Sequence, residues 1–317
     1  MMNILITGGA GFIGSSLADK LLSENHTVIV VDNFNDYYDV SIKENNVAHN
    51  LGNSRYKLYR TDIEDLESLQ HIFNENNIDV VVHLAARAGV RPSLEKPIEY
   101  VKTNIMGTVN ILECMRAKNI NKIVFASSSS VYGNCPEDIF SEDLKVTEPI
   151  SPYAATKSAC EQLLYTWHHL YGISVVALRF FTVYGPRQRP DLAIHKFAKM
   201  IKNHQAIHMY GDGSTKRDYT FISDILSGIC AAIDYDKTGF EIINLGGGEP
   251  ITLRDMIHTI EQTIGTDAII EQMPMQPGDV DKTVCDWSKA HKLLGYNPNT
   301  NFQTGIATFV DWFNSKR

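Results

Sequence analysis

A glycine-rich turn directly follows the first apolar run of the chain. The run at 3–7 leads into Gly8, Gly11 and Gly14, with one residue more between the first two glycines than in the common dinucleotide fingerprint. In such a turn the first glycine allows a tight bend, the second lets the backbone approach a pyrophosphate, and the third lets helix and strand pack closely. The helix that follows would direct its positive end at that pyrophosphate. The turn therefore predicts a strand–turn–helix unit that binds a dinucleotide.

The first 180 residues alternate short apolar runs with amphipathic stretches. The apolar runs lie at 3–7, 27–32, 56–60, 79–84, 122–126 and 174–181. Helix-like segments lie between them, among them 15–24 and 152–171. Several apolar runs are continuous rather than alternating, as expected for parallel strands that are buried on both faces. The pattern predicts an α/β fold of the Rossmann type, in which helices cover both faces of a doubly wound parallel sheet.

The regular alternation ends near residue 182. Turn-rich stretches such as Thr-Val-Tyr-Gly-Pro at 182–186 then interrupt shorter helices and strands. We therefore expect a dinucleotide-binding domain at 1–182 and a smaller substrate-binding region at 183–317. A later segment near 218–245 is expected to return to the first domain.

Composition excludes several functions. A net charge of −8 on 317 residues leaves no basic stripe for nucleic acid. No apolar run approaches the roughly 20 residues that span a bilayer, and no secretory signal opens the chain. Five separate cysteines without a CxxC pair favour a reducing compartment, so we expect a cytoplasmic protein. None of the eleven histidines joins a cluster with metal-ligand spacing, so no metal is expected.

An aspartate ends the second apolar run. Asp32 lies where a carboxylate can accept hydrogen bonds from the ribose of an adenosine. No Lys or Arg follows it until Lys43, so no cation close in sequence would attract a 2′-phosphate. The sequence therefore favours NAD over NADP.

Four serines at 127–130 end the apolar run at 122–126. A serine tract is often a flexible linker, but this one lies at the carboxyl end of a predicted sheet strand, where ligands bind. Tyr153 and Lys157 follow, four residues apart and on one face of a predicted helix. One such Tyr-x-x-x-basic pair is expected by chance, and Tyr56 with Arg60 forms another. The indication of a site comes from the order of the motifs along the chain.

In this order of motifs the chain resembles the extended short-chain dehydrogenase/reductase family, specifically its nucleotide-sugar-modifying enzymes, over essentially its whole length. The resemblance implies that Ser128, Tyr153 and Lys157 are catalytic. It also implies that helices near 98–118 and 153–171 pair with their copies in a homodimer. Beyond the glycines, Asp32, Tyr153 and Lys157, the implied NAD contacts are Phe12, Ile13, Asn33, Asp62, Ile63, Leu84, Ala85, Ala86, Asn104 and Phe180.

The chemistry requires an ionised tyrosine. A free phenol has a pKa of about 10, and lowering it to about 7 takes roughly 4 kcal/mol. The Lys157 ammonium and a positive nicotinamide ring both favour the phenolate. Tyr153 would then take the proton of a sugar hydroxyl while a hydride passes to NAD, and Ser128 would hydrogen-bond the reacting oxygen.

Ser129 and Ser130 limit which reaction follows. Dehydratases of this family carry Asp-Glu at these positions, and related UDP-glucuronate decarboxylases carry a Glu nearby. Serines cannot perform that acid–base step near neutral pH. What remains is return of the hydride to the opposite face of the sugar, which is 4-epimerisation.

The segments at 33–43, 86–97, 179–191 and 273–280 look most like those of UDP-glucuronate 4-epimerases. A uronate carboxylate suits an arginine fork, so Arg189 is the candidate, with Thr182 and the serines; Arg91 is a weaker one. The resemblance assigns Arg217 to the diphosphate, Tyr210 to the uracil region and Asp279 to the uridine ribose. Gln276 replaces an arginine that is typical of UDP-galactose 4-epimerases. The alternatives are a UDP-hexose or UDP-N-acetylhexosamine 4-epimerase, a UDP-glucuronate decarboxylase, and a non-catalytic NAD sensor.

Overall fold

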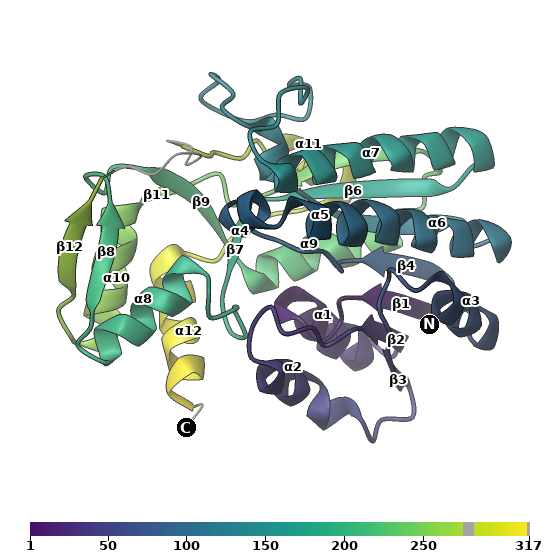
Figure 1. The fold of residues 1–317 in the computed structure, drawn as a ribbon, viewed down its shortest axis with the longest axis horizontal. Helices are drawn as coiled ribbons and strands as arrows, with labels where there is room; N and C mark the ends of the chain where they lie inside the picture. The colour runs from purple at the N-terminus through teal and green to yellow at the C-terminus, as the bar shows by residue number, and fades with distance from the viewer. Residues whose placement is uncertain (275–281, 316–317) are drawn as a thin grey trace.

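A seven-stranded parallel sheet forms the centre of the computed structural model, which describes residues 1–274 and 282–315 (Figure 1). The strand order is β10-β6-β5-β4-β1-β2-β3. The strands are β1 (Asn3–Thr7), β2 (Thr27–Asp32), β3 (Tyr56–Arg60), β4 (Val80–His83), β5 (Lys122–Ser128), β6 (Ser174–Phe180) and β10 (Phe240–Leu245). The order reverses next to β1, so the carboxyl ends of β1 and β4 diverge into a crevice where ligands bind. The predicted Rossmann-type sheet is confirmed.

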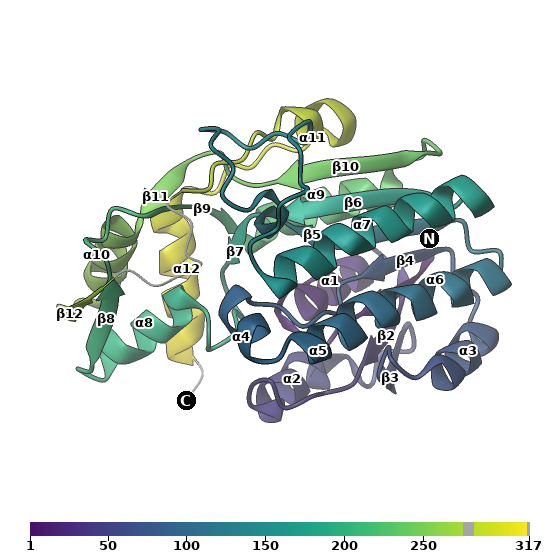
Figure 2. The ribbon, with the colours of Figure 1, turned by 45° about the horizontal axis from the view of Figure 1, so that its top comes forward.

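Helices cover both faces of the sheet (Figure 2). On one face α1 packs against α9, and on the other α6 packs against both α3 and α7. These helices are α1 (Phe12–Ser23), α3 (Leu66–Glu75), α6 (Gly107–Ala117), α7 (Pro152–Tyr171) and α9 (Ile222–Asp234). Alternate residues of each strand enter separate cores: Ile4 joins the α1 side and Leu5 the α6 side. Within 1–274 and 282–315, no helix combines the length and apolar character needed to cross a membrane.

Shorter elements shape the edge of the sheet that faces the crevice. They are α2 (Val40–Val47), a 3₁₀ turn at Ala48–Asn50, α4 (Val90–Glu95), α5 (Pro97–Tyr100), a π-helical turn at Val101–Met106 and a 3₁₀ turn at Ser129–Tyr132. The π-helical turn connects α5 to α6 without a break. Such turns are rare and are frequent at functional sites.

The second part of the molecule lies beside the crevice and is built from small sheets and helices (Figure 1). One sheet has the order β11-β9-β7, and β12 pairs with β8 in another. The strands are β7 (Thr182–Tyr184), β8 (Ala206–Tyr210), β9 (Lys216–Phe221), β11 (Pro250–Thr252) and β12 (Ile269–Met273). The helices are α8 (Ala193–Lys202), α10 (Leu253–Ile264) and α12 (Phe302–Ser315). Helix α11 (Ser288–Leu294) packs instead against β10 of the large sheet and against α9.

The chain passes between the two parts more than once. After β9 it returns to the large sheet, where α9 packs on α1 and β10 pairs with β6 along 240–245. The return begins at Ile222, because β9 itself belongs to the small sheet. We propose 1–182 as the nucleotide-binding part, with 222–245 and α11 added to it, and the rest of 183–317 as the sugar-binding part.

Candidate active site

The glycine turn has the geometry that its sequence predicts. Gly8 has a φ of +70°, a backbone conformation that side chains disfavour, and its N–H donates to the Val31 carbonyl over 2.7 Å. A Cβ added at Gly14 would lie 2.3 Å from the Gly8 carbonyl oxygen, so only glycine lets α1 start this close to β1. A Cβ at Gly11 would meet nothing nearer than that same oxygen, at 3.3 Å.

Replacing Gly14 with alanine should therefore disrupt the turn. Overpacking against rigid backbone costs about 1–3 kcal/mol, and the shift of Gly8 should also weaken dinucleotide binding. Urea unfolding and cofactor titration would measure the two effects. Gly52→Ala is the matched control, because an added Cβ there meets no heavy atom within 4 Å. Equal unfolding midpoints for the two variants would contradict this account of the turn.

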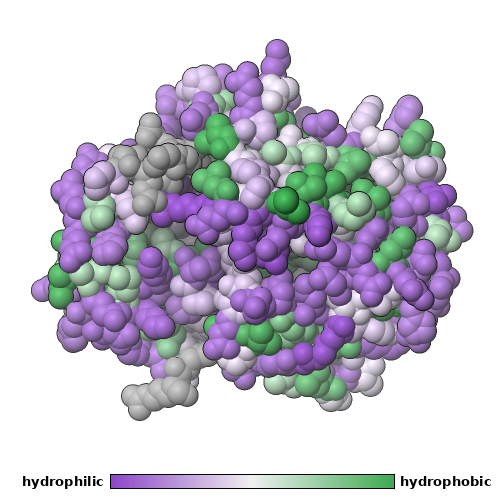
Figure 3. Space-filling model, viewed as in Figure 1, coloured by the Kyte–Doolittle hydropathy of each residue, from purple (hydrophilic) through white to green (hydrophobic). Residues whose placement is uncertain are grey.

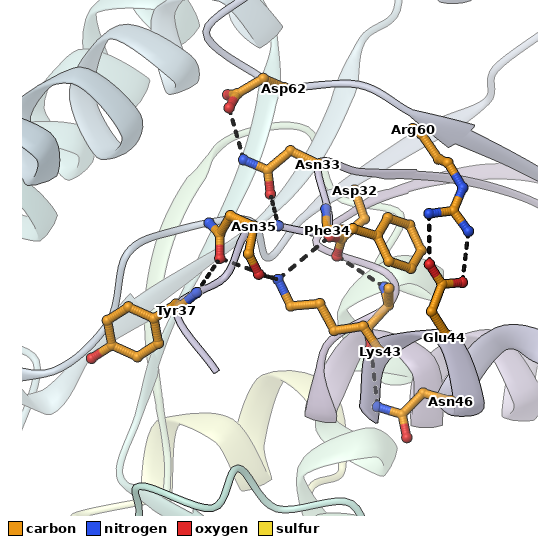
Figure 4. A network of polar contacts seen from close by, with 11 residues as sticks. Asp32, Asn33, Phe34, Asn35, Tyr37, Lys43, Glu44, Asn46, Arg60 and Asp62 are labelled. Carbon is orange, nitrogen blue, oxygen red and sulfur yellow. Dashed lines mark hydrogen bonds and ion pairs between the residues drawn. The ribbon is translucent and has the colours of Figure 1, made fainter. Parts of the chain in front are cut away.

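Asp32 organises the backbone around the turn (Figure 4). Its carboxylate accepts the Ala10 N–H over 3.0 Å and the Phe34 N–H over 2.8 Å. Lys43 Nζ lies 3.8 Å from the same carboxylate, because α2 folds back over the turn. The expectation that Asp32 has no cation nearby is therefore wrong. Lys43 is buried, and its ammonium donates to the Asn35 carbonyl over 3.0 Å.

An elongated cavity of about 360 Å³ runs along the carboxyl ends of the strands. Its lining includes the glycine turn and extends from Asp32 to Tyr153, which fits a bound dinucleotide. The predicted cofactor residues that line it are Gly8, Gly11, Phe12, Ile13, Gly14, Asp32, Asn33, Ile63, Leu84, Ala85, Ala86, Tyr153, Lys157 and Phe180. Asp62 stands outside this lining and accepts a hydrogen bond from the Asn33 amide over 2.7 Å. The sequence reasoning missed the lining residues Tyr37, Tyr38, Lys43 and Arg87.

Asn104 also stands outside the lining. It lies in the π-helical turn, and its amide oxygen accepts the Arg87 N–H over 2.8 Å. Its amide nitrogen donates to the Arg87 carbonyl over 3.1 Å and to Thr156 Oγ1 over 3.0 Å. The side chain is thus engaged in joining the loop after β4 to α7, which shapes the cavity wall from behind.

Ser128, Tyr153 and Lys157 come together at one end of the cavity. Ser128 ends β5, and α7 begins at Pro152, where Ser151 Oγ accepts the Ala154 N–H over 3.1 Å. The helix therefore begins one residue before Tyr153. Tyr153 and Ser128 both line the cavity, and the Ser128 hydroxyl lowers the pKa of Tyr153. Lys157, one turn further along, donates from Nζ to the Ala126 carbonyl over 2.7 Å.

The electrostatics of the pair differ from the sequence expectation. Burial raises the pKa of Tyr153, while the Ser128 hydrogen bond and the positive charge of Arg189 lower it in part. Burial lowers the pKa of Lys157 to about 8, against the opposing effect of Cys160 and Glu161. The chain's own residues therefore keep Tyr153 protonated, and Arg189 is a protein cation that lowers its pKa.

The other serines of the tract have different roles. Ser127 lines the cavity, and its Oγ donates to Glu161 Oε1 over 2.5 Å. Ser129 and Ser130 lie in the 3₁₀ turn and do not line the cavity. The Ser130 N–H donates to Ser128 Oγ over 3.2 Å, and the two hydroxyls are 3.1 Å apart. Ser130 therefore contacts Ser128 through both its backbone and its side chain.

Arg189 reaches the same end of the cavity from the second part of the molecule, and Thr182 lines it there as well. The Arg189 guanidinium binds Asp191 through two hydrogen bonds, with Nε–Oδ1 at 3.0 Å and Nη2–Oδ2 at 2.7 Å. The guanidinium carbon also lies 5.2 Å from the centre of the Tyr37 ring. The third guanidinium nitrogen, Nη1, takes part in neither of the two hydrogen bonds to Asp191.

Three further predicted residues line a second, adjoining cavity of about 240 Å³. They are Arg91, Tyr210 and Arg217, and Asp191 lines it too. The Arg91 guanidinium lies 5.0 Å from the centre of the Tyr210 ring. Arg91 therefore lies with the residues predicted to bind UDP, in a cavity that Asp191, the partner of Arg189, also lines. Gln276 and Asp279 lie outside the described residues.

A Rossmann-type sheet with a Ser–Tyr–Lys group at the dinucleotide cavity defines an extended short-chain dehydrogenase/reductase. Residues 5–309 match the family model described as GDP-mannose 4,6 dehydratase, and the chain belongs to that family. Among the described residues, no three or more His, Cys, Asp or Glu side chains group as a metal site.

Relatives of the chain are known over its whole length. A UDP-glucuronate 4-epimerase of Thermodesulfobacterium geofontis is 46% identical over 97% of this chain and 95% of its own. The structure of a UDP-glucuronic acid 4-epimerase of Bacillus cereus, with UDP-glucuronic acid and NAD, is similar with a TM-score of 0.92 at 38% identity, covering 99% of both chains. A Thermotoga maritima UDP-glucose 4-epimerase with UDP-glucose has a TM-score of 0.91 at 33% identity, again over 99% of both.

Proposed function

We propose that the chain is an NAD-dependent epimerase that converts UDP-glucuronate to UDP-galacturonate by inverting C4. The observation that carries this proposal is the position of Arg189, the one cation that both lines the large cavity and lowers the pKa of Tyr153 among the described residues. A sugar whose C4 hydroxyl approaches Tyr153 therefore has a guanidinium within reach of a C6 carboxylate. Two of the three relatives named above, those of Thermodesulfobacterium geofontis and Bacillus cereus, are UDP-glucuronate 4-epimerases and support this proposal.

The chain's own residues handle the proton and the orientation of the sugar. Bound NAD supplies the chemistry of accepting and returning two electrons at C4. Tyr153 removes the proton of the C4 hydroxyl and later returns it, while Ser128 hydrogen-bonds the same oxygen. Lys157, whose ammonium is fixed on the Ala126 carbonyl, provides positive charge below Tyr153. Arg189 holds the carboxylate, which keeps the sugar attached while its ring turns over.

Ser129 and Ser130 support epimerisation over dehydration, although the family model is described by a dehydratase activity. Their side chains are hydroxyls in the 3₁₀ turn, and Ser130 is engaged with Ser128. Removal of water across C5 and C6 needs a carboxyl group or another acid at this point. Neither hydroxyl can act as that acid near neutral pH.

We also propose NAD rather than NADP. Asp32 presents a carboxylate at the cavity wall, which repels a 2′-phosphate. Lys43 offsets part of that charge, but its ammonium is already engaged with Asn35 and Asp32. Titration with both cofactors should give tighter binding of NAD. Tighter binding of NADP would overturn this assignment.

The direct test is incubation of the purified protein with UDP-glucuronate, UDP-glucose or UDP-N-acetylglucosamine, followed by separation and mass analysis of the products. We expect an isobaric product from UDP-glucuronate at the highest rate. A UDP-pentose as the main product would identify a decarboxylase instead. Faster conversion of either neutral sugar would identify a hexose or N-acetylhexosamine epimerase.

We propose further that two copies form a dimer through α5, the π-helical turn and α7. Hydrophobic residues gather on this face in Figure 3, and Ile98, Val101 and Met106 are exposed there. Packing against a second copy would remove them from water. Light scattering should give twice the mass of one chain, and Ile98→Glu should lower it. A single-chain mass for the unmodified protein at micromolar concentration would refute the dimer.

We place the reaction in the cytoplasm. All five cysteines of the chain are free thiols, and Cys114, Cys160 and Cys285 are buried. Free thiols persist in reducing compartments. Fractionation of cells that produce the protein would test this assignment.

A further inference from the structure

Below the catalytic serine, α7 contacts the last three residues of β5 one after another. The Ser128 hydroxyl lowers the pKa of Tyr153, Lys157 donates to the Ala126 carbonyl, and Glu161 accepts from the Ser127 hydroxyl. The three helix residues are spaced by four, so they lie on one face of α7. Tyr153 and Lys157 belong to the catalytic group described above. Glu161 has no assigned role.

Glu161 is part of a buried ion pair. Arg179 of β6 binds it with two hydrogen bonds, Nε–Oε1 at 2.9 Å and Nη2–Oε2 at 2.7 Å. Only 1% of Arg179 and 4% of Glu161 is exposed. Beyond the pair, Arg179 Nη1 donates to the Tyr132 hydroxyl over 2.9 Å, which donates to Asn244 over 2.7 Å. Charges buried this deeply are costly, and an apolar pair of the same volume is often as stable.

We propose that Glu161 is a positioning residue of the epimerase reaction. Held by Arg179, it fixes Ser127 and therefore the end of β5 that carries Ser128. It also places a negative charge one helical turn from Lys157. This inference rests on the proposed function for its kinetic consequences. Its structural consequences can be tested without that function.

The charge matters because the other groups around Lys157 are neutral. Burial lowers the pKa of His83, on β4, to about 3, and raises the pKa of Cys160, on α7. Burial also raises the pKa of Tyr153, so its hydroxyl is protonated and neutral. The charged neighbours are thus Glu161 and, behind it, Arg179. Loss of the Glu161 charge would lower the pKa of Lys157 below its value of about 8, both directly and by exposing the charge of Arg179.

The test compares three variants of the full chain. Glu161→Gln should move the alkaline limb of the pH dependence of kcat to lower pH by at least half a unit, because Lys157 then loses its proton at a lower pH. Tyr132→Phe is the matched control: it disrupts the same buried network on the far side of Arg179 and should lower the Tm but leave the limb in place. Ser127→Ala should lower kcat several-fold with KM unchanged, and should speed amide hydrogen exchange at 126–130 without moving the limb.

The outcomes separate the two proposals. An alkaline limb that is the same in Glu161→Gln and Tyr132→Phe would overturn the inference while the proposed function stands. If Glu161→Gln does not fold, unchanged kcat and unchanged exchange at 126–130 in Ser127→Ala would overturn it. If the unmodified protein interconverts no UDP-uronate, the proposed function fails. Faster exchange at 126–130 in Ser127→Ala but not in Tyr132→Phe would then still support the positioning role, and equal exchange would refute it.

Discussion

Tyr153→Phe should lower kcat for UDP-glucuronate by about 10²–10⁴-fold, the usual contribution of a positioned general acid or base. The aromatic ring remains, so the cavity keeps its shape and substrate affinity should change little. The group that is lost is the one that exchanges a proton with the C4 hydroxyl. Steady-state kinetics, with cofactor and substrate binding measured separately, would check the result.

Tyr165→Phe is the matched control for this variant. Tyr165 lies on the same helix, is exposed, and is remote from the cavity lining. It should leave kcat unchanged. A Tyr153→Phe enzyme with kcat within tenfold of the unmodified protein would show that another group carries the proton. Unaltered biological function in that variant would favour a non-catalytic NAD sensor.

Arg189→Ala should lower kcat/KM for UDP-glucuronate roughly 30- to 4,000-fold, because a charge partner of the carboxylate is lost from a partly buried site. This loss corresponds to about 2–5 kcal/mol of binding free energy. UDP-glucose has no carboxylate, so its turnover should fall much less. The neutral sugar also serves as an internal standard. Any loss common to both substrates measures the effect of Arg189 on Tyr153.

Two variants refine the test of Arg189. Arg189→Lys keeps the charge but not the fork, and should recover only part of the uronate preference. Asp191→Asn removes the carboxylate that Arg189 binds here, and should keep that preference with a lower KM. An Arg189→Ala enzyme that loses equal activity toward both sugars would remove the arginine from carboxylate recognition.

The large sheet was predictable because local signals and burial agree. The runs at 27–32 and 56–60 became β2 and β3 with the predicted bounds, and 152–171 became α7. Continuous apolar strands need cover on both faces, which leaves few arrangements besides a doubly wound sheet. Gly8 and Gly14 were informative because only glycine fits at those two points.

Contacts between distant segments could not be predicted in this way. Lys43 is eleven residues beyond Asp32 in sequence, and only the fold of α2 brings it within 3.8 Å. The Glu161–Arg179 pair joins a helix to a strand, and each residue alone resembles an ordinary surface charge. Asn104 was predicted at the cofactor, but the π-helical turn directs its amide to the Arg87 backbone instead.

The late pairing of β10 with β6 has a consequence for how this chain is made and how it could have evolved. A ribosome must deliver residue 245 before the sheet acquires its last strand, and a fragment that stops at 182 would leave β6 as an open edge prone to aggregation. Recombination at a single joint therefore cannot exchange the small sheets and helices of the second part. A swap that preserves the sheet has to import two separate stretches, one on each side of 222–245.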